Sequence, residues 1–448
     1  MLEPMYRADV VIVGAGVAGL SAAHRLTSAG VTTTVLEAGP CAGGRMATEK
    51  VDGFRLDRVG QLLCTAYPEL RLTPGLDGLV LRPFAPGVLL HSDGRRHRAG
   101  LPAATGGARG ALHAVRALAS TPSRSAPRSG APLGTAVDQA RLGTALARLA
   151  ATRAERLLAR RELPAGQALA ARGLPARTVD GFLRPLLAAL LCDPELTTSS
   201  RVADLALRAY ASGRLCLPEG GAEALPELLA RGLPPGTVHT GVRVTSVSTN
   251  GVTTAEHGEI RCRAVLLATD ARAAAELLPG LRVPDFHPVT VVHHATDEPP
   301  GTGAFLLLDA DRGGPVAHTA VVSRVDPARA PAGRTLVSST VLGPPPPELD
   351  TAVRMHLARL YGTSTARWET LAVHHTAEAV PAMRPPHDLR RPVRLLAGLY
   401  VCGDHRDTST VQGALHSGHR ASAAILADLG AGSMHRAEPP GTALREAA

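Results

Sequence analysis

The sequence predicts an α/β protein whose parallel-sheet domain carries a second lobe of mixed α+β structure. The chain opens on an apolar strand, a glycine-rich turn and a helix, which is the start of a parallel βαβ unit. Strand and helix patterns of the same kind return in two later stretches, which long insertions separate. At 448 residues the chain is also too long for one simple core, so two lobes are expected.

The opening unit carries a glycine pattern with a distinct purpose at each position. Gly14 permits a tight turn, Gly16 removes a side chain where a phosphate must approach the backbone, and Gly19 lets the helix pack closely on the strand. A second apolar run, residues 31–36, ends at Glu37, where a carboxylate can accept hydrogen bonds from a ribose diol. The spacing predicts a Rossmann-like dinucleotide-binding unit whose helix N-terminus faces the phosphates.

The later stretches and the insertions divide the chain into two expected domains and a tail. The discontinuous cofactor-binding domain is expected to comprise residues 5–85, 215–284 and 395–430. The substrate-binding domain is expected to comprise residues 86–214 and 285–394, and residues 431–448 are expected to form a disordered tail.

Periodicity and turn residues place the elements that follow Glu37. Strands of the first domain are expected at 237–247, 252–255, 264–268 and 399–402, before an alanine-rich helix. In the second domain, a hairpin is expected to turn at Ser92, Asp93 and Gly94, and a mobile surface loop is expected at 121–132. Its helices are expected at 142–149, 154–159, 165–172, 178–191 and 349–361, and its strands at 289–293, 304–308, 317–323, 335–342 and 368–374.

Composition argues against several classes of protein. The formal charge of +9 comes from scattered arginines, since Lys50 is the only lysine, and aromatic residues make up only 2%. These features argue against a nucleic-acid-binding protein. The six cysteines show no metal-ligand spacing and are expected to be buried thiols in a reducing, cytoplasmic compartment, and no metal site is expected. No apolar run reaches 18 residues, so no spanning helix is expected, although peripheral membrane contact stays open.

Four further motifs follow the opening unit. A glycine-rich turn after the second strand ends in Gly43, Gly44 and Arg45, where close backbone and a forked cation suit a second phosphate contact. The others are Gly60-Gln61, a strand that begins near Val244, and a last segment with Gly403-Asp404 and the helix start Gln412-Gly413-Ala414.

In these five motifs, and over nearly its full length, the chain resembles the superfamily of FAD-dependent amine oxidases and phytoene desaturases. The resemblance implies a Rossmann-like FAD-binding domain with an inserted mixed-sheet and helical substrate domain. It also implies that FAD is bound by Gly14, Gly16, Val17, Ala18, Gly19, Glu37, Ala38, Gly43, Gly44, Arg45, Gly60, Gln61, Val244, Gly403, Asp404, Gln412, Gly413 and Ala414.

Two departures from the family pattern favour a desaturase-like branch over an amine oxidase. Lys50 does not lie where amine oxidases of the family place their lysine beside the flavin, and Thr410 stands where a cage aromatic is usual. The layout after Gly403 resembles that of plant-type carotenoid desaturases and related lipid dehydrogenases. No cysteine lies between residues 371 and 401, which implies non-covalent FAD.

The expected activity is hydride transfer to FAD from a carbon of a small-molecule substrate. Lipophilic substrates are included in this expectation. A second GxGxxG for NAD(P)H is missing, so electrons are expected to pass to oxygen or a quinone. Gln61, His405, Arg406 and Asp407 are candidates for positions beside the flavin ring, and no catalytic residue is assigned. Two alternatives stay open: an amine or amino-acid oxidase that releases hydrogen peroxide, and a non-catalytic prenyl or lipid carrier of the related fold.

Overall fold

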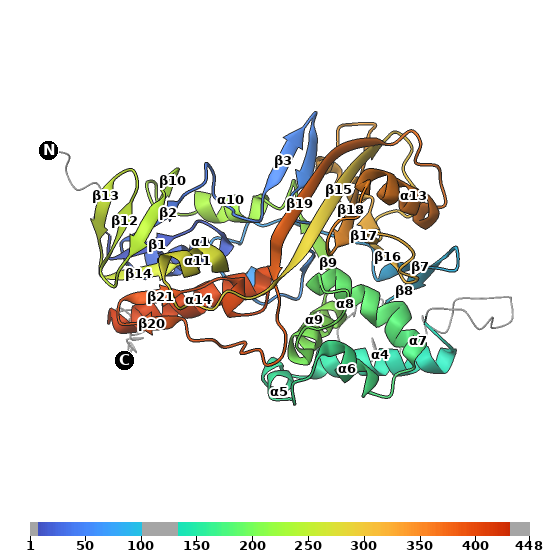
Figure 1. The fold of residues 1–448 in the computed structure, drawn as a ribbon, viewed down its shortest axis with the longest axis horizontal. Coiled ribbons are helices and arrows are strands. Elements are labelled where there is room, and N and C mark those ends of the chain that lie inside the picture. The colour runs from blue at the N-terminus through green and yellow to red at the C-terminus, as the bar shows by residue number, and fades with distance from the viewer. Residues whose placement is uncertain (1–7, 101–132, 431–448) are drawn as a thin grey trace, which may run out of the picture.

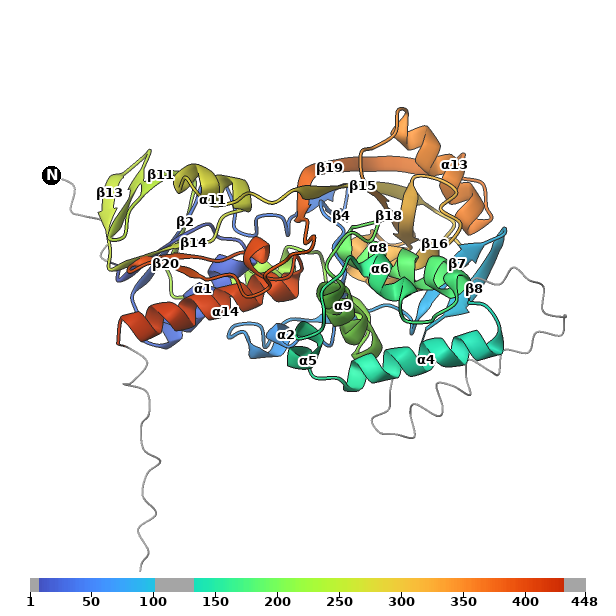
Figure 2. The ribbon, with the colours of Figure 1, turned by 60° about the horizontal axis from the view of Figure 1, so that its bottom comes forward.

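The computed structural model describes residues 8–100 and 133–430. The predicted loop at 121–132 and the predicted tail at 431–448 lie outside the described residues. Two lobes lie side by side, and the long strands β15 (Phe286–Thr296) and β19 (Glu369–Pro381) run from the region between them into the second lobe (Figures 1 and 2).

The first lobe is built on a mainly parallel sheet to which three distant stretches of chain contribute. Its described strands are, in order, β10 (Val238–Thr240), β2 (Thr33–Glu37), β1 (Val10–Val13), β14 (Ala264–Leu267), β21 (Leu399–Val401) and β20 (Arg394–Leu396), of which β20 is antiparallel. The register joins Val11 to Val265 and Val265 to Leu399, all of them buried. Such strands are apolar because both faces of the sheet are covered.

Helices cover one face of this sheet and a small sheet covers the other. Helices α1 (Val17–Ser28) and α14 (Val411–Asp428) pack together on the first face (Figure 2). They touch closely, because a Cβ on Gly418 would lie only 2.3 Å from the Ala18 carbonyl oxygen. On the other face, strands β11 (Val244–Val247), β12 (Gly251–Thr254) and β13 (Gly258–Arg261) share an apolar cluster with β1 and β14.

The second lobe is a mixed sheet with helices on both faces. Its described strands are, in order, β19, β15, β18 (Thr335–Leu342), β17 (Val316–Ala320), β16 (Leu307–Asp309), β7 (Val88–Ser92) and β8 (Arg95–Ala99). Helix α13 (Leu349–Tyr361) packs in one apolar cluster with this sheet. A second cluster gathers helices α4 (Ala136–Ala151), α5 (Ala154–Leu158), α6 (Ala165–Ala170), α8 (Arg184–Leu191) and α9 (Ser200–Ser212). The short helix α7 (Ala176–Thr178) contacts α4. The prediction of an α/β fold with an α+β second lobe is confirmed.

Several expected elements have different bounds. The expected helix at 178–191 contains a π-helical turn at Val179–Leu183 before α8 begins, because Pro185 has no N–H to donate to the carbonyl four residues earlier. The expected strand at 317–323 ends at Ala320, and the chain turns into the short helix α12 (Val322–Val325). Helix α9 was not predicted at all.

Smaller elements complete the first lobe and its border. Helices α2 (Glu69–Leu72) and α10 (Ala224–Arg231) lie between strands of the first lobe and its border, and α11 (Ala271–Leu277) lies between β14 and β15 of the second lobe. Strands β5 (Leu63–Cys64), β9 (Leu215–Pro218) and β6 (Leu81–Pro83) form a three-stranded sheet, and β3 (Thr48–Val51) pairs with β4 (Phe54–Asp57). The expectation that all cysteines are buried is wrong for Cys41, which lies exposed in the glycine-rich turn, and Cys262 is only partly buried.

Three buried histidines are expected to make the free energy of unfolding depend on pH. Burial lowers the pKa of His293, His318 and His405 to about 4, below the ordinary value of 6.5. Each neutral imidazole therefore stabilises the fold fully above pH 6.5, and this contribution is lost as the pH falls toward 4. We expect the free energy of unfolding to fall over this range, on the order of 3 kcal/mol for each histidine.

Urea denaturation at pH 7.5, 6.0 and 5.0 measures this fall in the free energy of unfolding. The variant His318→Gln is expected to show a smaller fall. A free energy of unfolding that stays constant from pH 6.5 to 5 would contradict the prediction.

Candidate functional site

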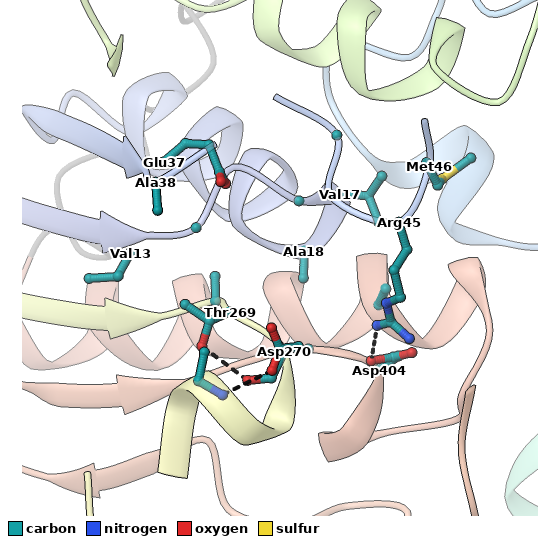
Figure 3. A pocket seen from close by; sticks show the side chains of 18 of the residues that line it. Val13, Val17, Ala18, Glu37, Ala38, Arg45, Met46, Thr269, Asp270 and Asp404 are labelled. Atoms are coloured by element: carbon teal, nitrogen blue, oxygen red, sulfur yellow. Dashed lines mark hydrogen bonds and ion pairs between the residues drawn. The ribbon is translucent and has the colours of Figure 1, made fainter. Parts of the chain in front are cut away.

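A cavity of about 670 Å³ lies at the carboxyl ends of β1, β2, β14 and β21. Ligands of open α/β sheets bind at this edge, and the volume is within the range of about 300–1,000 Å³ that is usual for small-molecule sites. Figure 3 shows side chains that line the cavity, from the first two strands, the segment around Arg45 and the segment around Asp404.

The turn between β1 and α1 forms one wall of the cavity. Gly14 has a φ of +105°, and a Cβ there would lie 2.9 Å from the Ala268 carbonyl oxygen. Gly16 precedes the first turn of α1, which has no side-chain cap, and nothing lies within 4 Å of an added Cβ. Val17 and Ala18 also line the cavity, so the first turn of the helix faces it. An uncapped helix N-terminus offers N–H groups and a partial positive charge to an anion.

Gly19 lies behind this wall and outside the lining of the cavity. A Cβ on Gly19 would lie 2.2 Å from the Gly14 carbonyl oxygen and 3.0 Å from the Ala268 Cβ. Its part is therefore to let α1 pack against the strands, which holds the glycine turn in place.

The carboxylate of Glu37 is held in a fixed position at the end of β2. Its Oε2 accepts a hydrogen bond from the Ala15 N–H at 2.8 Å, and its Oε1 accepts one from the Gly39 N–H at 2.8 Å. Ala38 and Val244 line the cavity in the same region. The remaining lone pairs of the carboxylate can accept hydrogen bonds from a ligand's hydroxyl groups.

An ion pair between Arg45 and Asp404 joins two segments that are 359 residues apart. The Arg45 Nη2 and the Asp404 Oδ1 are 2.7 Å apart, and the Asp404 side chain is only 9% exposed (Figure 3). Arg45 also donates to the Ala379 carbonyl oxygen at 2.6 Å, so it contacts β19 as well. Gly43, Gly44 and Gly403 line the cavity beside this pair.

The start of α14 forms the wall near the second lobe. The Thr410 Oγ1 caps the helix by accepting from the Gly413 N–H at 3.1 Å, and Thr410, Val411 and Ala414 line the cavity. Gln61 lines it too, and its Nε2 donates to the Ser409 carbonyl oxygen at 3.2 Å.

Three of the expected cofactor-binding residues in this region do not line the cavity. The Gln412 side chain points to α2 and accepts from the Glu69 N–H at 2.9 Å. A Cβ on Gly413 would lie 1.9 Å from the Thr408 carbonyl oxygen, so this glycine serves a close contact with the preceding loop. Gly60 lies against β15 and β18 instead, where a Cβ would meet Thr340.

The other candidates for positions beside the ring also lie outside the cavity lining. After Asp404 the chain makes a 3-10 turn (Asp404–Arg406) that carries it away from the cavity. His405 is buried in this turn, and Arg406 donates to the Pro392 carbonyl oxygen. Asp407 pairs with His416 at 2.9 Å. Of the four candidates, only Gln61 lines the cavity.

Thr269 and Asp270 line the cavity but were missed from the sequence. They follow β14 directly, and Asp270 caps α11 by accepting from the Arg272 and Ala273 N–H groups at 2.9 Å each (Figure 3). The signal was available, since the strand itself was predicted and ligands bind at the carboxyl ends of parallel strands.

No helix in the described ranges is both long enough and apolar enough to cross a membrane.

Comparison with known families gives one match that covers most of the chain. The family described as flavin containing amine oxidoreductase matches residues 17–426. Curated relatives match shorter segments. Putrescine oxidase of Kocuria rosea is 41% identical over 100 residues, which are 21% of this chain and 20% of that protein. Phytoene desaturase of Cercospora nicotianae is 33% identical over 97 residues, which are 20% of this chain and 16% of that protein. The chain thus matches a fifth or less of the length of these relatives.

Solved structures match over nearly the full chain. An oxidoreductase from Methanosarcina mazei superposes with a TM-score of 0.68 at 17% identity, over 92% of this chain and 99% of that one. Cyclohexylamine oxidase from Brevibacterium oxydans superposes with a TM-score of 0.63 at 18% identity, over 95% of this chain and 100% of that one. At these identities the likeness shows a shared fold.

Proposed function

Because this chain belongs to the family of flavin-containing amine oxidoreductases, we propose that it is an FAD-dependent oxidoreductase that acts on an apolar, unsaturated carbon skeleton. The substrate is a small molecule of isoprenoid-like or secondary-metabolite type. The FAD is bound non-covalently, and a hydride moves to it from a substrate carbon. Oxygen or a quinone then takes the electrons. The protein works in the cytoplasm, where contact with a membrane surface is compatible with a lipophilic substrate.

The residues of the cavity fit FAD in their chemistry. The open space at Gly16 and the uncapped first turn of α1 suit a pyrophosphate, which carries negative charge. The fixed carboxylate of Glu37 suits the hydroxyl groups of a ribose. Arg45 supplies a forked cation, which Asp404 holds in place. FAD, when bound, supplies a ring that accepts a hydride.

The helix start at Thr410 suits the ring end of the cofactor. The partial positive charge of a helix N-terminus stabilises negative charge that develops close to it. Thr410, Val411 and Ala414 bring the first turn of α14 to the cavity wall. Gln61, held by its hydrogen bond to Ser409, is the polar side chain that we place beside the reacting atoms. We assign it to positioning of the substrate, because an amide does not titrate and cannot act as a base.

The observation that carries the substrate class is the apolar lining where the cavity meets the second lobe. Val59 and Ala379 line the cavity and belong to a cluster with Val289, Val291 and Val380 of the second lobe. Aliphatic side chains contribute to binding by burying an apolar ligand surface.

Two residues argue against an amine substrate. Lys50, the only lysine of the chain, lies on β3 and pairs with Glu223 at 2.9 Å, outside the cavity lining. Thr410 supplies no aromatic ring at the position where an amine cage would need one.

Spectroscopy of the purified protein tests the proposal. We expect a yellow protein whose FAD is released on denaturation. In anaerobic mixing, polyenes and related unsaturated lipids are expected to bleach the flavin band, while putrescine, cyclohexylamine and amino acids leave it unchanged. Bleaching by amines alone, with hydrogen peroxide formed on admission of air, would show an amine or amino-acid oxidase instead. A colourless protein that takes up no added FAD would support the carrier alternative.

A further inference from the structure

A second group of ligand-type side chains lies in the second lobe, at the carboxyl ends of the neighbouring strands β7 and β16. The two strands are parallel neighbours, and the register places His91 directly beside Asp309 (Figure 1 shows both strands). Beyond β16 the chain turns back, and Asp311 comes to the same point. One ligand atom from each of the three residues lies within 4.8 Å of the others.

The histidine of this group has no hydrogen-bond partner among the described residues. His91 is 8% exposed, and both of its ring nitrogens are buried without a partner. Its Nδ1 lies 3.9 Å from the Asp309 Oδ1 and 3.8 Å from the Asp311 Oδ2. A protonated imidazole that served as an ion-pair partner would donate at about 2.8 Å. Buried nitrogens without partners cost free energy, which calls for another partner at this point.

Both carboxylates are held in place by hydrogen bonds from neighbouring backbone and hydroxyl groups. Asp309 accepts from the Gly313 N–H at 2.7 Å and from the Asp311 N–H at 3.2 Å. The Asp311 carboxylate accepts from the Ser92 hydroxyl at 2.7 Å and from the Asp93 N–H at 2.8 Å. The loops that follow β7 and β16 therefore hold the two carboxylates in fixed positions.

His356 orients Asp309 from α13. Its Nδ1 accepts from the Val316 N–H, so in the neutral ring the proton is on Nε2, which lies 3.2 Å from the Asp309 Oδ2. Residues that orient a ligand in this way are typical of metal sites.

We infer that His91, Asp309 and Asp311 form a site for a divalent transition cation of the Zn²⁺ class, which joins the carboxyl ends of β7 and β16. One imidazole and two carboxylates leave a fourth position for water in a tetrahedral arrangement. Ligand atoms around such an ion are about 3.4 Å apart, so small side-chain movements close the site. The imidazole favours Zn²⁺ over Ca²⁺ or Mg²⁺, which prefer oxygen ligands alone. Arg96 lies opposite His91 on β8, but it is exposed, so water screens its charge.

This site could not be predicted from the sequence, because Asp309 and Asp311 lie 218 and 220 positions after His91 and the three residues share no spacing motif. Only the parallel pairing of β7 with β16 brings them together.

Metal binding to the tag-free full chain tests this inference. After treatment with a chelator, one Zn²⁺ per chain is expected to bind, measured by calorimetry and by elemental analysis, and the thermal unfolding midpoint is expected to rise. Asp311→Asn and His91→Gln are each expected to weaken binding at least tenfold and to abolish the rise. Asp311 is half-exposed, so its variant reports on the site even if His91→Gln fails to fold.

A neighbouring histidine supplies the control. His97 lies on β8 opposite Leu90, one position from His91 in the register, so its side chain is on the other face of the sheet. His97→Gln is expected to bind Zn²⁺ as the unaltered chain does. The inference would be overturned by no uptake of Zn²⁺, or by equal affinity in Asp311→Asn and the unaltered chain.

Discussion

Replacement of Arg329 by alanine is expected to lower the free energy of unfolding by about 3–5 kcal/mol, because it leaves buried carboxylates without a partner. The Arg329 side chain is 2% exposed. Its Nε donates to Asp326 at 3.1 Å and its Nη1 donates to Asp57 at 2.7 Å, and both of these carboxylates are buried or nearly so. Urea denaturation measures the loss.

The same arginine joins the second lobe to the border of the cavity. Asp57, at the end of β4, also accepts from the N–H of Ala222, a cavity residue, at 2.8 Å. Weaker FAD binding is therefore expected to accompany the loss of stability.

An exposed pair gives the matched control. Arg367 and Glu298 are 86% and 82% exposed and lie 3.3 Å apart. Arg367→Ala is expected to change stability by about 1 kcal/mol or less. Arg329→Lys keeps the positive charge but lacks the forked guanidinium group, so an intermediate loss in the free energy of unfolding is expected. This loss stays measurable if the alanine variant does not fold. Equal losses for Arg329→Ala and Arg367→Ala would contradict the argument.

Replacement of Arg45 by alanine is expected to weaken FAD binding roughly 10- to 100-fold, because a hydrogen bond to a charged group contributes about 1.5–3 kcal/mol. The variant removes the cation that we place at the phosphates. It also leaves the Asp404 carboxylate, 9% exposed, unpaired beside an anionic ligand. Titration of the apoprotein with FAD, followed by flavin fluorescence, measures the affinity.

Two further variants separate charge from structure. Arg45→Ala combined with Asp404→Asn removes both charges and is expected to recover part of the affinity. Glu276 also lines the cavity, and Glu276→Gln is expected to leave binding unchanged or slightly tighter, since it removes a negative charge. An affinity of Arg45→Ala within threefold of the unaltered chain would remove Arg45 from the proposed phosphate site.

The parts of the fold that could be predicted are those whose causes are local. Gly14 and Gly16 were identified because a tight turn at the end of a strand, next to a phosphate, requires glycine at two positions that only one residue separates. A further local signal was present but not used. Asp52 and Gly53 have φ values of +47° and +82°, and this Asp-Gly pair is the turn of the β3–β4 hairpin.

The errors at the second cavity wall have a geometric cause. Gln412, Gly413 and Ala414 are consecutive on α14, and adjacent residues on a helix point in directions about 100° apart. Only Ala414 of the three lines the cavity, while Gln412 turns to α2 and Gly413 turns to the preceding loop. A motif read as a block of residues cannot distinguish these directions.

By itself, the sequence determined the parallel βαβ opening, the α/β class with its second lobe and the family to which the chain belongs. These depend on apolar periodicity and on glycine positions, which are properties of short segments. Only the tertiary structure decided which side chains share a space, such as Arg45 with Asp404, or His91 with Asp309. Those contacts depend on strand register and on the packing of segments hundreds of residues apart, and no local pattern in the chain encodes them.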